Sequence, residues 1–199
     1  MIERKSRKGA FEPSQHIGRE NRGLGSYAIK KVVGVGRKMA VDMFIKIGDI
    51  VGEAKDAVHG DEIDVLIWDW KMSQSGTMHV GGGGGGGKVS IRSLNFTKYC
   101  DKATPSLMLA CSSGKHFPEA ILTVRKAGEN PLEYLVIRLE DVIVTSISTS
   151  GFDVNDRPAE FVTLNFARVS VEYRAQAQDG SADGGVIHYG WDVATNTAI

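Results

Sequence analysis

Two long stretches of alternating apolar residues constrain the fold more than any other feature of this sequence. They cover 132–148 and 160–175, and in each the apolar phase slips by one residue near the middle. Alternation with period two indicates β-strands, and a one-residue slip turns every later side chain to the other face unless a bulge or bend absorbs it. We therefore expect two long strands that bend and serve both sheets of a barrel or sandwich.

The remaining elements are short. A helix is expected from Thr104, as its N-cap, and Pro105, as its first residue, to Gly114, which can end it in a left-handed conformation. Shorter strands are expected at 43–47, 62–72, 89–96, 120–126 and 185–193. This pattern predicts a mainly β domain of antiparallel strands with one short helix.

The expected strand 62–72 has two largely apolar faces, which indicates that both are covered. We assign the face that carries Trp68 and Trp70 to the core. The opposite face, which carries Ile67, Asp69 and Lys71, becomes polar along the strand. That face should therefore meet solvent or a partner.

Charge divides the chain near Met39. The 199 residues have a formal net charge of zero, but residues 1–38 hold ten Lys and Arg against three acidic residues, and the remainder compensates. The first 38 residues also show no sustained apolar period, so we expect a disordered basic extension followed by one domain at 39–199. We interpret the extension as upstream sequence from a misassigned start or as an added tail. The alternative is a tail that binds nucleic acid or anionic lipid.

The sequence contains few motifs that indicate catalytic chemistry. Residues 82–87 of the glycine run and Lys88 fit the first seven positions of a phosphate-binding loop, but Val89 replaces the required Ser or Thr and a strand pattern follows. Cys111 and His116 could form a nucleophilic pair, but Cys111 shares a helix face with Leu107 and is expected to pack. The five histidines are scattered, so we predict no metal, no cofactor and no enzymatic activity.

Targeting signals are equally sparse. The sequence contains no apolar run of the length needed to span a membrane, and the basic start is not followed by the apolar core of a signal peptide. The two cysteines, Cys100 and Cys111, are expected to be reduced thiols. Two long, glycine-bearing loops at 48–61 and 79–88, together with a strand that is apolar on both faces, indicate a domain that assembles with copies of itself.

Several motifs after Met39 occur together and in order. They are MAVDMFIKIGDI (39–50), EIDVLIWDW (62–70), MSQSGTMHVGGGGG (72–85), FTKYCDKATPSLMLACSSGKH (96–116), LTVRKAG (122–128), VTLNFARVSVEY (162–173) and GGVIHYGW (184–191). In these motifs the chain resembles the haemolysin-coregulated protein family, the inner-tube protein of the bacterial type VI secretion system. The resemblance covers about 160 residues and does not include 1–38.

The resemblance implies a compact antiparallel β-barrel of two sheets with a short α-helix on its side. It implies a homohexameric ring, rings stacked into a tube, a contractile sheath that expels the tube beneath a spike protein, and small effector proteins carried in the lumen. Such a protein would be cytoplasmic before firing and then secreted without a signal peptide, and it would bind no nucleic acid and span no membrane.

The resemblance also suggests which residues meet partners. Family members often carry a serine at the position of Asp69, which we expect to face the lumen together with Ile67 and Lys71. The two glycine-bearing loops would then contact neighbouring protomers or rings. The candidate contact residues are Gly48, Asp49, Gly52, Glu53, His79, Gly81, Gly84 and Gly87.

Overall fold

The computed structural model describes residues 41–75, 88–127, 131–151, 157–177 and 181–199. The chain divides into two units, Met1–Val35 and Gly36–Ile199, and every described residue lies in the second. The predicted basic extension and all of the second glycine-bearing loop except Lys88 lie outside the described residues. His79, Gly81, Gly84 and Gly87 are therefore not placed.

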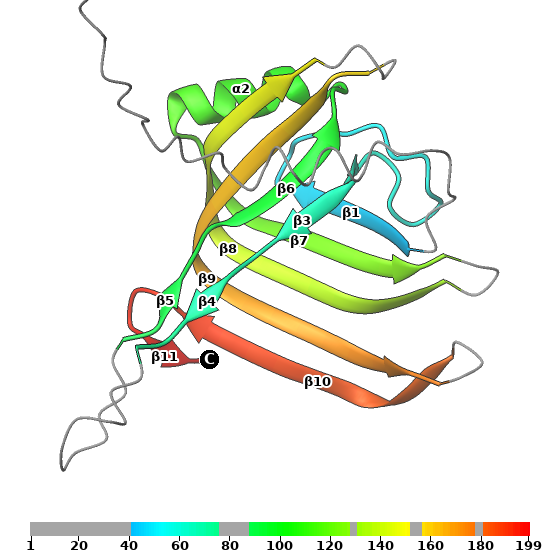
Figure 1. The fold of residues 1–199 in the computed structure, drawn as a ribbon, viewed down its shortest axis with the longest axis vertical. Coiled ribbons are helices and arrows are strands. Elements are labelled where there is room, and N and C mark those ends of the chain that lie inside the picture. Colours follow the sequence, from blue (N-terminus) through cyan, green and yellow to red (C-terminus); the bar gives the residue numbers. More distant parts are fainter. Residues whose placement is uncertain (1–40, 76–87, 128–130, 152–156, 178–180) are drawn as a thin grey trace, which may run out of the picture. The chain divides into compact units, whose positions relative to one another are not determined.

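The described residues form a mostly β structure with one helix, as the sequence predicts (Figure 1). The main antiparallel sheet has the order β11-β10-β9-β8-β7-β1-β2, and β6 joins it by pairing with β9 on one side and β3 on the other. The bounds of its strands are β1 Val41–Ile47, β2 Ile63–Asp64, β3 Ile67–Asp69, β6 Leu94–Tyr99, β7 His116–Lys126, β8 Leu132–Ser150, β9 Ala159–Gln176, β10 Ala182–Asp192 and β11 Thr197–Ala198. A small second sheet pairs β4 Met72–Ser73 with β5 Ser90–Ile91.

The two predicted phase slips lie side by side in the sheet. The buried positions of β8 change phase across Asp141, and those of β9 change phase across Ala167, with the flanking residues paired directly. A third slip, which the sequence pattern did not reveal, falls at Pro118 in β7, opposite Asp141. Asp141 adopts a φ of 53°, a left-handed conformation that is uncommon outside glycine. The strands bend along this line (Figure 1), so both halves of each strand turn their apolar side chains to one core.

The prediction of one continuous strand at 62–72 is wrong. The stretch forms β2, β3 and β4, because its first part pairs with β1 and its next part pairs with β6. The change of partner falls between Val65, whose N–H bonds to a β1 carbonyl, and Leu66, whose N–H bonds to a β6 carbonyl. The predicted strand 89–96 is divided in the same way, into β5 and β6. The barrel is consequently interrupted rather than closed by one continuous ladder.

The helix α2, Thr104–Ser113, begins one residue earlier than predicted, with Ala103 as its N-cap. Gly114 ends it with a φ of 65° and donates its N–H to the Ala110 carbonyl, as the sequence predicts. The Thr104 hydroxyl does not cap the helix. It donates instead to the carboxylate of Glu160 at 2.8 Å, which ties the helix to β9.

A buried ion pair lies beneath the start of α2. Lys98 and Glu160 face each other across β6 and β9, both are fully buried, and Lys98 Nζ lies 2.8 Å from Glu160 Oε2. Lys98 also donates to Asp101 at 2.7 Å, and the hydroxyl of Thr149 donates to Glu160 at 3.1 Å. Burial alone would raise the pKa of Glu160, but the hydrogen bonds from Lys98 and Thr104 outweigh it and the pKa is lowered. The pair therefore stays ionised inside the core.

Replacing Lys98 with Met should cost about 3–5 kcal/mol of unfolding free energy, because Glu160 would remain as a buried charge without its cation. Urea unfolding at neutral pH measures this loss. Lys102→Met is the matched control, since Lys102 pairs with Asp61 at the exposed surface and such pairs contribute less than about 1 kcal/mol. Equal losses in the two variants would show that the buried pair is not important for stability.

Candidate assembly and lumen surfaces

A polar face covers the outer side of β3, β6, β9 and β8. Asp69, Asn95 and Thr163 lie opposite one another in one row, and Ser146 of β8 continues it. The amide of Asn95 donates to Asp69 Oδ2 at 3.0 Å, and the hydroxyl of Thr163 donates to Asn95 Oδ1 at 2.9 Å. Asn165 adds a longer bond to Ser93 at 3.3 Å. These hydrogen bonds hold the amide and hydroxyl side chains in place around the single carboxylate of Asp69.

The predicted lumen residues fall on or beside this polar face. Asp69 and Lys71 are exposed, and Ile67 is half-buried. Trp68 and Trp70 lie against the core on the other side, which confirms that assignment. The indole N–H of Trp70 also donates to the Arg92 carbonyl at 2.9 Å. Whether Asp69, Ile67 and Lys71 face a lumen stays a prediction.

The loop between β1 and β2 carries the four described contact candidates, and each has a partner within its own chain. Gly48 has a φ of 48°, and a Cβ there would lie 2.6 Å from the ring of Phe117; a Cβ at Gly52 would overlap the backbone of Glu62. Asp49 pairs with Lys115, and Glu53 accepts a hydrogen bond from the backbone N–H of Lys102. The glycines are thus required by the fold of the loop itself.

Asp56 anchors the middle of this loop to the sheet. Both of its carboxylate oxygens accept hydrogen bonds from the guanidinium of Arg125, at 3.0 and 2.5 Å, and Arg125 also binds Asp42 at 3.1 Å. The hydrogen bonds from Arg125 and from the backbone N–H of Val58 hold the pKa of Asp56 well below its usual range. Arg125 is only 6% exposed, so these charge-assisted hydrogen bonds lie in surroundings of low dielectric constant.

His59 forms a second anchor. Its ring stacks on Phe44 with centroids 4.6 Å apart, and its two nitrogens contact the carboxylates of Glu62 and Glu133. The two anchors hold the loop against β1, β7 and β8, yet Val51 and Val58 remain 49% and 72% exposed. The loop is therefore a rigid element that presents apolar side chains to solvent.

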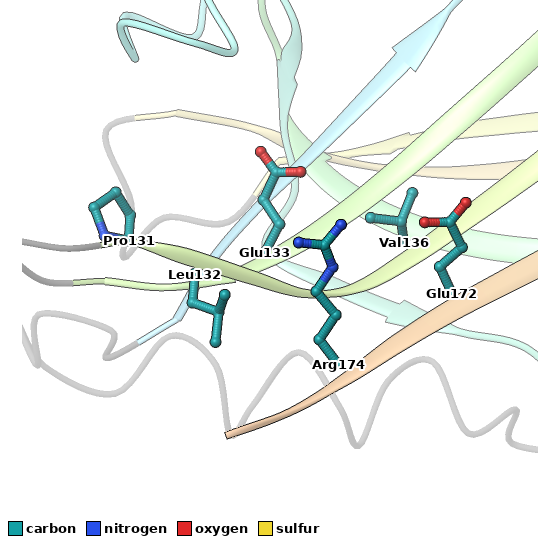
Figure 2. A pocket seen from close by; sticks show the side chains of 6 residues that line it. All are labelled: Pro131, Leu132, Glu133, Val136, Glu172 and Arg174. Carbon is teal, nitrogen blue, oxygen red and sulfur yellow. The ribbon is translucent and has the colours of Figure 1, made fainter. Parts of the chain in front are cut away.

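A shallow hollow adjoins this loop at the start of β8 (Figure 2). It is lined by Pro131, Leu132, Glu133, Val136, Glu172 and Arg174. Three of the six side chains are charged, Glu133 from β8 and Glu172 and Arg174 from β9, and none of the six is a Cys, Ser, Thr or His. The hollow thus contains no hydroxyl, thiol or imidazole nucleophile.

The structure separates the residues of the alternative enzymatic hypothesis. Cys111 packs against the core, as predicted, while His116 lies at the surface with its Nδ1 3.0 Å from Asp141. Within the described ranges no hydrogen bond joins Cys111 to His116, and no group of three His, Cys, Asp or Glu side chains is arranged to hold a metal ion. Among the described residues, no helix has the length and apolar character to cross a membrane.

Comparison with known proteins identifies the family of this chain. A family model described as "Type VI secretion system effector, Hcp" matches residues 44–173. This chain is a member of the Hcp family. It is 62% identical to protein hcp1 of Pseudomonas aeruginosa over 159 residues, which are 79% of this chain and 98% of the relative.

Solved Hcp structures agree with the fold. The crystal structure of Hcp1 from Salmonella typhimurium is 41% identical, with a TM-score of 0.67 over 81% of this chain and all of that chain. A structure of a type six secretion system protein is 32% identical, with a TM-score of 0.76 over 80% of this chain and all of that one. Membership confirms the function inferred from the sequence, a structural protein of the type VI secretion tube, over the hydrolase alternative.

Sequence reasoning missed the residues that anchor the loop and the helix. Lys98 and Glu160 left a readable signal, because each stands in phase with the apolar residues of its strand. A charge at a core position predicts a buried partner. Asp56, Arg125 and His59 left none, since Asp56 and Arg125 are 69 residues apart in the chain and meet only in the fold.

Replacing Asp56 with Asn should lower the melting temperature at neutral pH. The pKa of Asp56 is depressed in the folded state, so its contribution is present above the range of an unfolded carboxyl, near 3.9, and is lost as pH falls through the folded pKa. The gap between wild type and variant should therefore shrink toward about pH 2. Thermal unfolding across pH measures it. Asp49→Asn, which breaks an exposed pair of the same loop, should change little.

Proposed function

We propose that this protein forms a homohexameric ring, that rings stack into the inner tube of a type VI secretion system, and that the polar face lines the lumen. The observation that carries the proposal is the row Asp69, Asn95 and Thr163. One side of this sheet packs against the core. On the other side, these residues form a wall whose side chains are hydrogen-bonded to one another. Such a wall offers polar contacts to a passenger without an apolar surface that would trap it.

The anchored loop supports the contacts between copies. Its exposed Val51 and Val58 stand on a backbone that is already ordered, so docking costs little conformational entropy. A ring requires that unlike surfaces of neighbouring copies meet head to tail. We assign the loop, with Gly48, Asp49, Gly52 and Glu53, to contacts between protomers or stacked rings.

The partners follow from the tube role. We propose other copies of this chain, the spike protein at the tip of the tube, and small effector proteins in the lumen, with no nucleic acid. The protein would reside in the cytoplasm before firing and leave through the type VI system without a signal peptide. It would act without catalysis of its own.

Negative-stain microscopy of the purified chain should show six-membered rings with an open centre, and light scattering should give a mass of about six protomers, because ring formation needs only copies of this chain. Monomers at every concentration would contradict the proposal. Val58→Asp places a charge on the loop without touching its anchors. It should leave the subunit folded but weaken contacts between copies.

Asp69→Lys should leave the rings intact but change which proteins stay bound in them, because a ring of carboxylates becomes a ring of ammonium groups. Asp69→Asn is the matched control, since it removes the charge at nearly constant volume. Mass spectrometry of proteins that co-purify with the rings compares the two with wild type. Rings that dissolve in Asp69→Lys would place Asp69 at an interface instead of the lumen.

A further inference from the structure

The outward face of α2 carries no charged side chain. Its exposed residues are Pro105, Ser106, Met108, Leu109, Ser112 and Ser113. Leu109 is 69% exposed and Met108 is 41% exposed. A helix at the surface of a protein ordinarily turns charged and polar side chains toward solvent. The composition of this face is instead typical of a surface that another molecule covers.

The β1–β2 loop extends this face of α2. Lys102, which precedes the helix, donates its backbone N–H to Glu53 at 3.0 Å, and Lys115, which follows the helix, pairs with Asp49 at 2.8 Å. At about 3.3 Å per residue this part of the loop spans up to about 13 Å, close to the length of about 15 Å of the ten-residue helix. The loop therefore runs beside α2, and Val51 lies midway between its two attachments.

The result is one apolar surface with a polar rim. This surface, the helix patch, consists of Val51, Met108 and Leu109. The lysines at its rim, Lys102 and Lys115, are paired with Asp61 and Asp49 of the loop. An apolar centre inside a polar rim is the usual anatomy of a contact between proteins. Because these rim charges are balanced within the chain, the helix patch favours an apolar partner over an ionic one.

A second apolar patch lies on the main sheet. Tyr173 of β9 pairs with Leu135 of β8 on one side and with Ile187 of β10 on the other, and these three residues form the sheet patch. The neighbouring row at Val171, two residues along the strand, packs against the core. The sheet patch therefore continues the apolar phase of the core, yet Ile187 is 65% exposed and Tyr173 is 44% exposed.

The two patches lie at opposite ends of β9 (Figure 1). Thr104, the first residue of α2, donates to Glu160 near the start of β9, whereas Tyr173 stands near its end. At about 3.3 Å per residue the strand from 160 to 173 measures up to about 43 Å. The patches of one chain therefore do not cover each other. Their shapes match, because a helix packs readily on the face of a sheet.

We propose that the helix patch of one copy docks on the sheet patch of the next copy around the ring. The inference rests on the proposed ring for its occupant, a second copy of this chain. A ring closes only through contacts between unlike surfaces of neighbouring copies. Each copy presents one patch of each kind, so a closed ring leaves neither exposed. Leu109 would lie at the centre of the contact, against Tyr173 and Ile187.

Disulfide cross-linking of the full chain tests this contact. In the double variant Leu109→Cys/Ile187→Cys the two new thiols meet only between copies, so mild oxidation should give a ladder of covalent multimers that ends at six chains on a non-reducing gel. Leu109→Cys/Met72→Cys is the matched control, because Met72 is exposed on β4 and belongs to neither patch. It should stay mainly monomeric on the gel. Wild type under the same oxidation accounts for Cys100 and Cys111.

A charge pair gives an independent test of the same contact. Leu109→Lys should leave the subunit folded, because Leu109 is exposed, but raise the protein concentration needed for half-assembly on the order of tenfold or more. Adding Ile187→Glu should restore part of this loss, since the two introduced charges would face each other between copies. Met72→Lys should leave assembly unchanged. Light scattering on dilution measures assembly, and thermal unfolding checks the fold.

The outcomes separate this contact from the ring itself. Six-membered rings without a cross-link between 109 and 187, or with equal cross-linking of the control, would overturn the contact and leave the tube proposal intact. Cross-linked open chains without rings would support the contact and refute the ring alone. A chain that stays monomeric and forms no cross-link would overturn both.

Discussion

The strands can enclose one core only because their apolar phase reverses together at Pro118, Asp141 and Ala167. Three neighbouring strands change their buried face at the same register, and Asp141 adopts a left-handed backbone conformation on that line. Without a shared line, one strand would turn its apolar residues outward while its neighbour turned them inward. Because the slips coincide, one set of long strands bends and encloses a single core. The polar face and the loop between β1 and β2 both lie on the outer surface of this bent sheet.

The core enclosed in this way is not purely apolar. Lys98 and Glu160 meet inside it, and their bonds to Asp101, Thr104 and Thr149 join β6, β9, β8 and the beginning of α2. Buried charges of this kind are costly to leave unpaired. The network therefore specifies one position for α2, a helix that is too short to be stable alone. This network restricts the position of α2 more than the packing of Leu107 and Ala110 alone would.

The tube assembly that we propose places opposite demands on the two outer surfaces. A surface that contacts other copies gains from being rigid before contact, and the loop meets this demand through Arg125 and His59, which hold it from two sides. In the same proposal the row of Asp69, Asn95 and Thr163 faces the passenger, and it stays polar while its side chains satisfy one another's hydrogen bonds. The loop has side-chain anchors because its backbone runs outside the sheet ladder, whereas the polar face is ordered by the ladder beneath it.

Four features could be predicted from the sequence: the class of fold, the bent pair of long strands, the end of α2 at Gly114 and the core side of Trp68. Each of these follows from local periodicity or backbone preference, which act between near neighbours in the chain. It also carried the motifs that identify the family. The break in 62–72, where the chain passes from β1 to β6, could not be predicted, because the pairing partners come from distant segments. The contacts of Asp56 with Arg125 and of His59 with Glu133 are likewise tertiary, since a charged side chain in a loop shows no period that would reveal its partner.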